Sequence, residues 1–308
     1  MDIGIIKEIW RYPVKSMAGE RLKTCKVDPL GIPGDRGWAL RDETKGEITN
    51  GKRFPLLMQC AARYRTEPAG SFIPQVDIFL LDGSSTSSDD PEVNTRLSEL
   101  LRKPVTLWPR VSPENLEHYR RKSKAARVLG KLAKFGPFRS ALPTLASFGG
   151  ANTELREVFS REPNEPIPDI STLPPELMEF TSPPGTYFDA FTIHILTTAS
   201  IAIMSRLNPS ALWDSRRFRP NFLIETNEQL KGLVESEWEG RTLRVGTVQL
   251  RCAIPTARCG MTTHAQQDLP KDPSVLRSIV KDANQNMGTY ANVAVPGEVR
   301  LGDHVELL

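Results

Sequence analysis

Short apolar segments with alternating polarity, each stopped by glycine or proline, constrain the fold of this chain more than any other feature. In the text "VQLRCAIP", Leu250, Cys252 and Ile254 alternate with polar or small residues, which is the period of a strand with one buried face. Comparable runs are "IGIIKEIWRYP", which Pro13 interrupts, "FTIHILTT" and "GEVRLGDHVELL". Many short strands with glycine turns and few long helical patterns predict an α+β fold, mainly β, built from barrel-like domains.

The text divides into three segments. Residues 1–110 are β-rich and include one expected helix, for which Asp90 is the predicted N-cap and Pro91 the first helical position. Residues 111–186 combine a basic run with proline-rich polar text, which predicts an insert or linker with one basic helix. Residues 187–308 are β-rich again. We therefore predict two ordered domains, 1–110 and 187–308, joined by an insert at 111–186.

The composition favours an ordinary soluble globular protein. Of the 308 residues, 39% are hydrophobic and 25% are charged, and no apolar run approaches the roughly 20 residues that span a bilayer. The start of the sequence contains no hydrophobic segment typical of a signal peptide. Four scattered cysteines do not suggest a disulfide scaffold. We expect a reduced, cytoplasmic protein without a membrane span.

Positive charge is concentrated in one stretch, although the net charge is only +3. The run "YRRKSKAARVLGKLAKFG" would suit an anionic partner, whether nucleic acid, a membrane surface or an acidic protein. Charge runs are more often solvated surfaces, so the run indicates only a mild preference for an anionic partner, and nucleic-acid binding is not expected.

Cys259 lies in a setting unlike that of Cys252. Cys252 falls on the apolar face of a strand, where a free cysteine behaves as a small hydrophobe. Cys259 follows Pro255 in the loop text "TARCGMTT", and the neighbouring Arg258 would favour a thiolate, the form that attacks electrophiles or binds soft metals. Zinc is not expected, because the chain has no CxxC pair. The local text leaves a structural thiol and a ligand or nucleophile equally open.

Cations and hydroxyl groups at strand ends form a second set of candidates. Fixed cations and hydroxyls in such places favour binding of a phosphorylated ligand, since they pair with phosphate oxygens. The members of this set are Lys15, Ser16, Arg36, Thr197, Thr198, Ser200, Arg216, Arg217, Arg219 and Asn221. Each taken alone has a plain structural reading, as a capping hydroxyl or a surface arginine.

The same segments resemble the MOSC family (molybdenum cofactor sulfurase C-terminal domain) and the β-barrel domain that precedes it in many members. The matching text is "YPVKS", "GIPGDRGWAL", "GKRFPLL", "DDPEVNTRLSELLRKPV", "ILTTAS", "RRFRPNFLIET", "RCAIPTARC" and "VPGEVRLGDHVEL". The resemblance covers most of the chain in the family order, and extends to the mitochondrial amidoxime-reducing component and its bacterial counterparts. It implies an N-terminal MOSC β-barrel domain in 1–110 and a MOSC domain in 187–308.

The resemblance implies a binding site for the molybdenum cofactor, a pterin dithiolene with a terminal phosphate. Cys259 would be the molybdenum ligand and the catalytic residue. Cofactor contacts would come from Lys15, Ser16, Arg36, Thr197, Thr198, Ser200, Arg219, Asn221, Arg258 and Tyr290. A nucleotide extension of the pterin is left open.

The resemblance also implies an activity, the reduction of N-hydroxylated or N-oxygenated small molecules. Because no cysteine pattern for an iron–sulfur domain is present, electrons would come from a separate ferredoxin-, flavodoxin- or cytochrome b5-like protein. The ligand text reads "TARC" where related reductases often read "CxRC". Two alternatives remain: a sulfur carrier acting through a Cys259 persulfide, and a non-enzymatic cofactor-binding protein. His264 is either a proton donor or a solvated side chain, and His194 is expected in the core.

Overall fold

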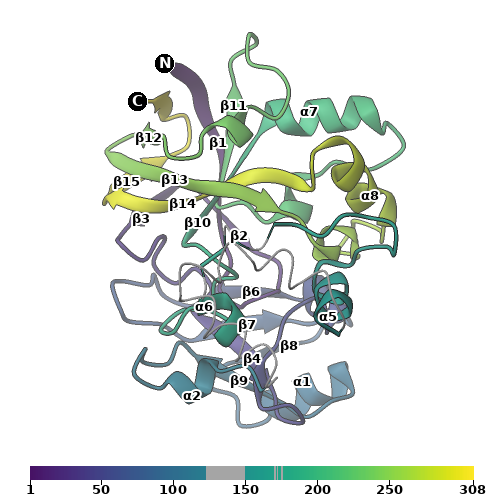
Figure 1. The fold of residues 1–308 in the computed structure, drawn as a ribbon. Coiled ribbons are helices and arrows are strands. Elements are labelled where there is room, and N and C mark those ends of the chain that lie inside the picture. The colour runs from purple at the N-terminus through teal and green to yellow at the C-terminus, as the bar shows by residue number, and fades with distance from the viewer. Residues whose placement is uncertain (123–149, 170, 172, 175) are drawn as a thin grey trace.

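A computed structural model describes residues 1–122, 150–169, 171, 173–174 and 176–308. The chain forms a β-barrel, at the top of Figure 1, and a set of small sheets below it. Strands outnumber helices in the described part, so the predicted α+β, mainly β architecture is confirmed.

The barrel is built from seven of the described strands. Their order around the barrel is β11-β10-β14-β13-β12-β16-β1, and pairing of β1 with β11 closes it. Strands β10 and β11 are parallel to each other, while the other barrel pairs are antiparallel. The strand bounds are β1 Asp2–Arg11, β10 Ile193–Thr197, β11 Phe222–Thr226, β12 Thr242–Val245, β13 Val248–Ala257, β14 Asn286–Val295 and β16 His304–Leu307.

Alternation along the strands decides which side chains fill the barrel. Ile193 and Ile195 belong to the barrel core together with Cys252, which is 1% exposed. Leu196 packs instead on the outside, in the apolar cluster formed with the helices. The prediction that Cys252 is a core residue is therefore confirmed. The same alternation places His194 on the outer face of the barrel, toward the candidate site.

Strand β1 joins the barrel although it begins the chain. It ends before Pro13, as predicted, and its neighbours in the barrel are β11 and β16 from the second half of the sequence. Strand β2 (Glu20–Leu22) extends the sheet beyond β1. The two halves of the chain thus share one element, and the predicted domain boundaries remain predictions.

The N-terminal half otherwise forms two small antiparallel sheets below the barrel (Figure 1), with the orders β5-β4-β9 and β6-β7-β8. A two-stranded sheet of β3 and β15 lies beside the barrel instead, where Cys25, Val27 and Val299 join the barrel core. Their bounds are β3 Thr24–Val27, β4 Trp38–Asp42, β5 Glu47–Ile48, β6 Ala61–Tyr64, β7 Val76–Phe79, β8 Ser85–Ser87, β9 Val105–Pro109 and β15 Gly297–Arg300, with the 3-10 helix η1 at Pro55–Gln59.

Helix α1 (Val93–Leu101) covers these sheets and buries Val93, Leu97 and Leu101. It begins three residues after the predicted N-cap, so the predicted start is wrong. The Asp90 carboxylate accepts hydrogen bonds from the Glu92 backbone N–H at 2.9 Å and from the Thr86 hydroxyl at 2.8 Å. Asp90 therefore stabilises the turn before the helix, because its side chain reaches a donor only two residues away.

Helices of the second half pack on the outside of the barrel. An apolar cluster that includes Leu196, Met204 and Ile279 joins α7 and α8 to the strands. The bounds in this half are α7 Thr198–Leu207, η3 Ser215–Phe218, η4 Val234–Glu237, η5 Gly260–Thr263 and α8 Pro273–Asp282. The described part of 111–186 contains α2 (Leu116–Tyr119), α5 (Gly150–Phe159) and α6 (Glu176–Glu179). The predicted basic helix belongs to the run at 119–136, of which residues 123–136 lie outside the described residues.

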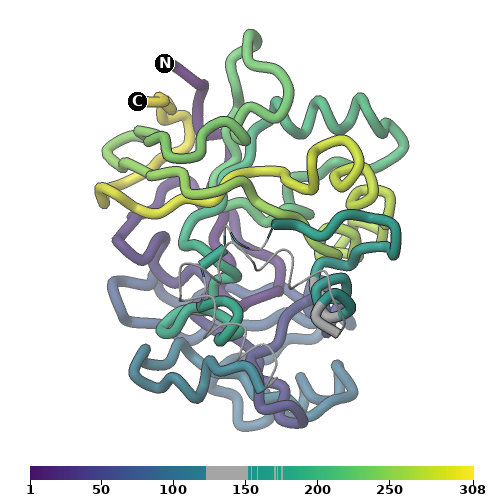
Figure 2. The backbone as a smooth tube through the Cα atoms, viewed as in Figure 1, coloured from purple at the N-terminus to yellow at the C-terminus, as the bar shows by residue number. Residues whose placement is uncertain are grey.

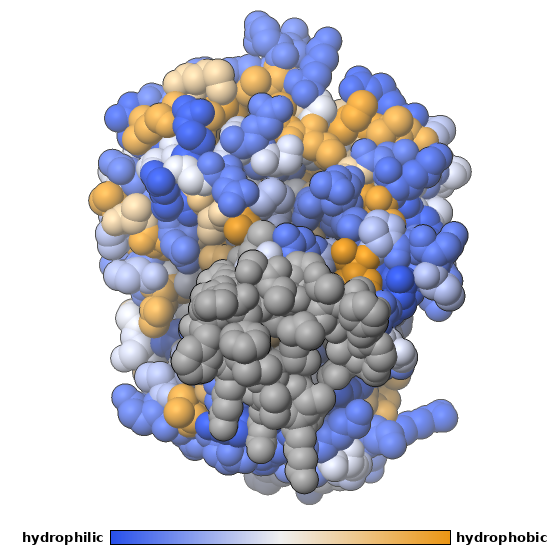
Figure 3. All heavy atoms as spheres, viewed as in Figure 1, coloured by the Kyte–Doolittle hydropathy of each residue, from blue (hydrophilic) through white to orange (hydrophobic). Residues whose placement is uncertain are grey.

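The first and last residues lie beside each other at the top of the barrel (Figure 2), where the Met1 amino group donates to the Leu307 carbonyl at 2.8 Å. None of the helices described here has the length and apolar character needed to cross a membrane. On the described part of the face in Figure 3, hydrophobic residues over the barrel are interrupted by hydrophilic ones.

Candidate functional site

Four buried or nearly buried cations meet where the barrel faces the N-terminal sheets. Lys15, Arg219 and Arg258 are 5%, 8% and 8% exposed, and the Arg36 side chain is 12% exposed. Lys15 follows β1, Arg36 lies in the turn at residues 31–37, and Arg219 and Arg258 directly follow η3 and β13. We call these four residues the cationic cluster. All four are among the cofactor contacts that the family resemblance implies.

Lys15 is held by the protein at three points. Its Nζ donates to the Tyr187 carbonyl at 2.7 Å, to Asp189 Oδ1 at 2.6 Å and, more weakly, to Ser182 Oγ at 3.5 Å. Burial lowers the pKa of Lys15, while the Asp189 carboxylate acts in the opposite direction. The position of the ammonium is therefore fixed.

Two acidic residues lie at this site: Asp35, which is 3% exposed and forms an ion pair with Arg36, and Asp189, whose side chain is 61% exposed. Its surroundings oppose ionisation by burial, but the ammonium of Lys15 outweighs that effect, assisted by Lys52 and Arg36, so the pKa of Asp189 is lowered. All three N–H donors of Lys15 Nζ have acceptors, so an incoming anion would have to replace the exposed Asp189 carboxylate. No periodicity or motif in the sequence marks Asp189.

Tyr12 supports two of the cations through its ring. The guanidinium carbons of Arg219 and Arg36 lie 4.2 Å and 4.7 Å from the ring centroid, within the range of cation–π contacts. Both arginines have left-handed backbone conformations, with φ of 55° and 50°. Such residues cost about 1–3 kcal/mol each and cluster at functional sites. Burial lowers the pKa of Arg219 to about 10, with Tyr12 opposing and Arg36 adding to the shift.

Arg258, the residue before Cys259, contacts His194 on the outer face of the barrel. Its Nη2 donates to the Phe218 carbonyl at 2.8 Å, and its Nη1 lies 3.3 Å from His194 Nε2. Because a guanidinium only donates, Nε2 must accept, which leaves the proton on Nδ1, 3.4 Å from the Arg219 carbonyl. Burial, together with the charge of Arg258, holds the pKa of His194 well below its usual value. The expectation that His194 is buried and hydrogen-bonded is confirmed.

Cys259 differs from the other three cysteines in exposure. It is the second residue after β13, directly precedes η5 and is partly exposed, whereas Cys25, Cys60 and Cys252 are buried. Burial raises the pKa of those three thiols to about 12, 11 and 12. Cys259 is therefore the thiol that a ligand or reagent can reach.

Tyr290 lies near Cys259 on the neighbouring strand. It pairs with Ile254 of β13, and its ring centroid is 5.5 Å from that of His194. Burial raises its pKa, and the charges of Asp189, Arg258 and Cys259 all act on it. Tyr290 thus belongs to the same site as the cationic cluster.

Two buried donors at the site have no hydrogen-bond partner in the part of the chain that the structure describes. They are Arg219 Nη2 and Arg258 Nε. A buried donor left unpaired costs about 1–3 kcal/mol, so these atoms indicate a place for an acceptor. An anionic group with several oxygens, such as a phosphate, would satisfy both the charge and the donors.

The donor set also fits a metal that is already held by another chelate. Among the described residues, no group of three or more His, Cys, Asp or Glu side chains could hold a metal ion. A single cysteine thiolate is a soft ligand, and it would complete the coordination of a metal held by pterin sulfurs. The residues present therefore fit the molybdenum cofactor.

Two predicted contact residues serve the framework of the site. Ser16 Oγ accepts from the Gly51 backbone N–H at 2.8 Å. Asn221 accepts from the His194 backbone N–H at 3.0 Å and donates to Asp35 at 2.9 Å. These bonds fix the chain on either side of the cationic cluster. A direct contact with cofactor remains a prediction for both.

The three predicted hydroxyls bind protein groups elsewhere. Thr197 and Ser200 donate to the buried carboxylate of Glu235 at 2.7 Å and 2.6 Å. Thr198 Oγ1 accepts from the Thr226 backbone N–H at 3.1 Å and lies 3.2 Å from its hydroxyl. The structure does not bring them to the cationic cluster, and their role in cofactor binding stays a prediction.

Arg161 enters the site from the insert, which the sequence analysis did not foresee. It is 6% exposed and donates to the Arg258 carbonyl at 2.9 Å. Burial lowers its pKa to about 10, opposed by the charges of Glu165 and Cys259. His264, predicted as a proton donor or a solvated residue, has a pKa lowered by burial. Its catalytic role is untested.

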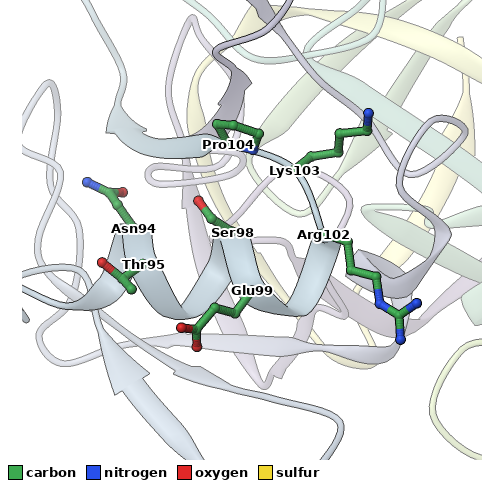
Figure 4. Close-up of a pocket in the computed structure, with 7 residues that line it drawn as sticks. All are labelled: Asn94, Thr95, Ser98, Glu99, Arg102, Lys103 and Pro104. Atoms are coloured by element: carbon green, nitrogen blue, oxygen red, sulfur yellow. The ribbon is translucent and has the colours of Figure 1, made fainter.

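A separate hollow of about 540 Å³ lies along α1 (Figure 4). It is shallow and contains none of the predicted site residues. Its lining consists of Asn94, Thr95, Ser98, Glu99, Arg102, Lys103 and Pro104.

Comparison with known proteins identifies the family. Residues 184–306 match the MOSC domain, and residues 3–102 match the MOSC N-terminal beta barrel domain. The chain is a MOSC-domain protein. This family is associated with the molybdenum cofactor, in agreement with the donor set described above.

Individual relatives of this MOSC protein are distant. It is 23% identical over 324 residues to mitochondrial amidoxime reducing component 2 of Bos taurus, covering 99% of this chain and 83% of that protein. Among solved structures, the YUAD protein of Bacillus subtilis aligns with a TM-score of 0.41 at 12% identity, over 99% of this chain and 95% of that one. YiiM of Escherichia coli aligns with a TM-score of 0.30 at 18% identity, over 38% of this chain and 54% of that one.

Proposed function

We infer that this MOSC protein is a molybdenum-cofactor-dependent oxidoreductase that reduces N-hydroxylated or N-oxygenated compounds. The observation that carries the proposal is the pair of unsatisfied guanidinium donors, Arg219 Nη2 and Arg258 Nε, buried in a cationic cluster next to a reachable thiol. The similarity to an amidoxime reducing component supports the substrate class.

Each part of the site would have a distinct task. Cys259 Sγ would ligate molybdenum, while Lys15, Arg36, Arg219 and Arg258 would bind the phosphate of the pterin. When bound, the cofactor would supply two electrons; with two protons from solvent these would convert an N–OH group to N–H and water. The contacts of Arg258 with His194 and Phe218 hold its guanidinium in place, so no reorganisation is needed when the anion binds.

The proposed electron donor is a separate ferredoxin-, flavodoxin- or cytochrome b5-like protein, since an acidic redox protein would be attracted to the basic run. The described start of this run is already partly neutralised. Arg120 pairs with Glu117 and Glu179, and Lys122 pairs with Glu117. Most of the remaining positive charges lie in residues 123–149, outside the described part.

The test is metal and cofactor analysis of protein produced in cofactor-replete cells, followed by an assay of benzamidoxime reduction with a chemical electron donor. We expect stoichiometric molybdenum that is lost in Cys259→Ala together with activity. Wild-type protein without molybdenum, or Cys259→Ala protein with full molybdenum content, would refute the proposal.

A sulfur carrier is the second candidate, because Cys259 is the exposed thiol among the four cysteines. In that case Cys259 would carry a persulfide as the nucleophilic or transferable sulfur. Metal-free protein with a labile sulfur on Cys259, detected by mass spectrometry, would support it.

A further inference from the structure

The segment that follows α5 contacts the loop of Cys259, although it lies outside both sequence regions that match the family. The matched regions end at residue 102 and begin again at residue 184, so Arg161 belongs to neither. Arg161 is nevertheless 6% exposed and contacts the residue that precedes Cys259. Buried arginines rarely occur without specific partners, so each of its hydrogen bonds is informative.

The guanidinium of Arg161 binds three acceptors at once. Nη2 donates to the Arg258 carbonyl at 2.9 Å, Nε to Gln285 Oε1 at 3.0 Å, and Nη1 to the Phe159 carbonyl at 2.7 Å. The planar fork of an arginine suits such an arrangement, because its donors point in fixed, different directions.

The backbone of Arg258 is thereby held from both sides. Its N–H donates to the Gln285 carbonyl at 2.9 Å, while its own carbonyl accepts from Arg161. Gln285 has a φ of 67° and is itself held by the Ile279 carbonyl of α8 at 3.0 Å. The peptide that leads into Cys259 is thus fixed to two other elements.

The segment of Arg161 is also anchored independently on α8. Arg277 donates to the Ser160 carbonyl at 2.6 Å and forms ion pairs with Glu162 at 3.5 Å and with Glu165. Ser160 lies against Gly260, since a side chain at position 260 would collide with its Oγ. The segment therefore lies directly over the loop of Cys259.

We propose that Arg161 is a positioning residue that fixes the Cys259 loop, and hence the thiolate that holds molybdenum. The part concerning molybdenum rests on the function proposed above; the part concerning the loop does not. The inference predicts that the hydrogen bonds of Arg161, rather than the mere presence of its segment, keep the loop in place.

The test compares Arg161→Met with Arg277→Met. Both substitutions keep an unbranched stem and remove a guanidinium, but only the first removes the donor to Arg258. Amide hydrogen exchange of residues 257–260 is measured in cofactor-free protein. Loss of this bond should speed exchange by about three- to tenfold in Arg161→Met, the factor that one net hydrogen bond represents. Arg277→Met should match wild type.

Molybdenum retained after dialysis provides the second readout, and it should fall in Arg161→Met by at least about threefold on the same scale. Unchanged exchange in Arg161→Met, or an equal rise in Arg277→Met, would overturn the inference. If Arg161→Met does not fold, Arg161→Gln decides: its amide nitrogen takes the place of Nε but is too short to replace Nη2 at the Arg258 carbonyl, so wild-type protection in that variant would also overturn it. Wild-type protein without molybdenum would refute the proposed function, while hydrogen exchange would still test the role of Arg161.

Discussion

Lys15→Met should leave the stability of this protein nearly unchanged but lower its affinity for an anion. Lys15 is 5% exposed, and its ammonium donates to the Tyr187 carbonyl, Asp189 and Ser182. Methionine preserves most of the stem and removes the charge. The expected effect of this substitution therefore differs between cofactor-free and cofactor-bound protein.

In cofactor-free protein the contributions of this substitution to the free energy of unfolding largely cancel. The Tyr187 carbonyl loses its donor, which costs about 1–3 kcal/mol. Asp189, whose side chain is 61% exposed, turns to water at little cost. Removing a buried ammonium returns its desolvation penalty, which is on the order of several kcal/mol. We therefore expect the free energy of unfolding in urea to change by less than about 2 kcal/mol.

In cofactor-loaded protein the substitution also removes a hydrogen bond to the cofactor phosphate, and nothing compensates for that loss. One charge-assisted hydrogen bond to a phosphate contributes about 1.5–3 kcal/mol, so affinity should fall roughly 10- to 150-fold. Molybdenum content after dialysis measures this loss. The control is Lys7→Met, which removes an exposed ion pair with Glu225 and should change neither property. A loss of more than about 4 kcal/mol of stability, or wild-type molybdenum content, would refute the reasoning, because Lys15 would then serve the fold alone.

Three further predictions concern the barrel. Burial raises the pKa of Glu235 above its ordinary 4.5, opposed by its hydrogen bonds with Ser200 and Thr197, so its stabilising contribution is present below that value and is lost as the pH rises through the folded pKa. Urea denaturation between pH 4 and 8 should show Glu235→Gln gaining stability over wild type as the pH rises; a constant difference would contradict this. Thr197→Val should lose about 1–3 kcal/mol of stability but keep its molybdenum, and a folded variant without the metal would show that Thr197 binds cofactor. Leu250→Ala, in the barrel core, should lower the unfolding free energy by about 2–5 kcal/mol, whereas Val295→Ala, at a position 41% exposed, should stay near wild type; equal losses would be inconsistent with the described core.

Alternating polarity was sufficient to predict the mainly β architecture and the burial of Cys252, because one buried strand face produces that pattern directly. The pattern carries no information on which strands pair, so it did not indicate that β1 closes a barrel of much later strands. The start of α1 was missed because Asp90 caps a turn as well as it would cap a helix.

Lys15 and Arg36 were found from sequence because a proline ends the strand before the first and glycines flank the turn of the second. Arg258 was included through the family resemblance, and β13 continues through Pro255, so no proline interrupts the strand that precedes it.

The hydroxyls of Thr197 and Ser200 were predicted to bind phosphate, but their observed partner, Glu235, lies more than thirty residues further along and carries no local signal. Arg161 and Asp189 were missed for the same reason, since both act across long sequence separations. Residue type and position can indicate a charged site, but long-range contacts decide which groups occupy it.

Strand β1 has a consequence for how the chain is made. Strand β1 leaves the ribosome long before β11 and β16, the two barrel strands that pair with it. Closure must wait for nearly the whole polypeptide, and contacts of such long range make folding slow. Until then β11 and β16 would present open edges to other chains, so a fragment that lacks the first eleven residues should tend to aggregate.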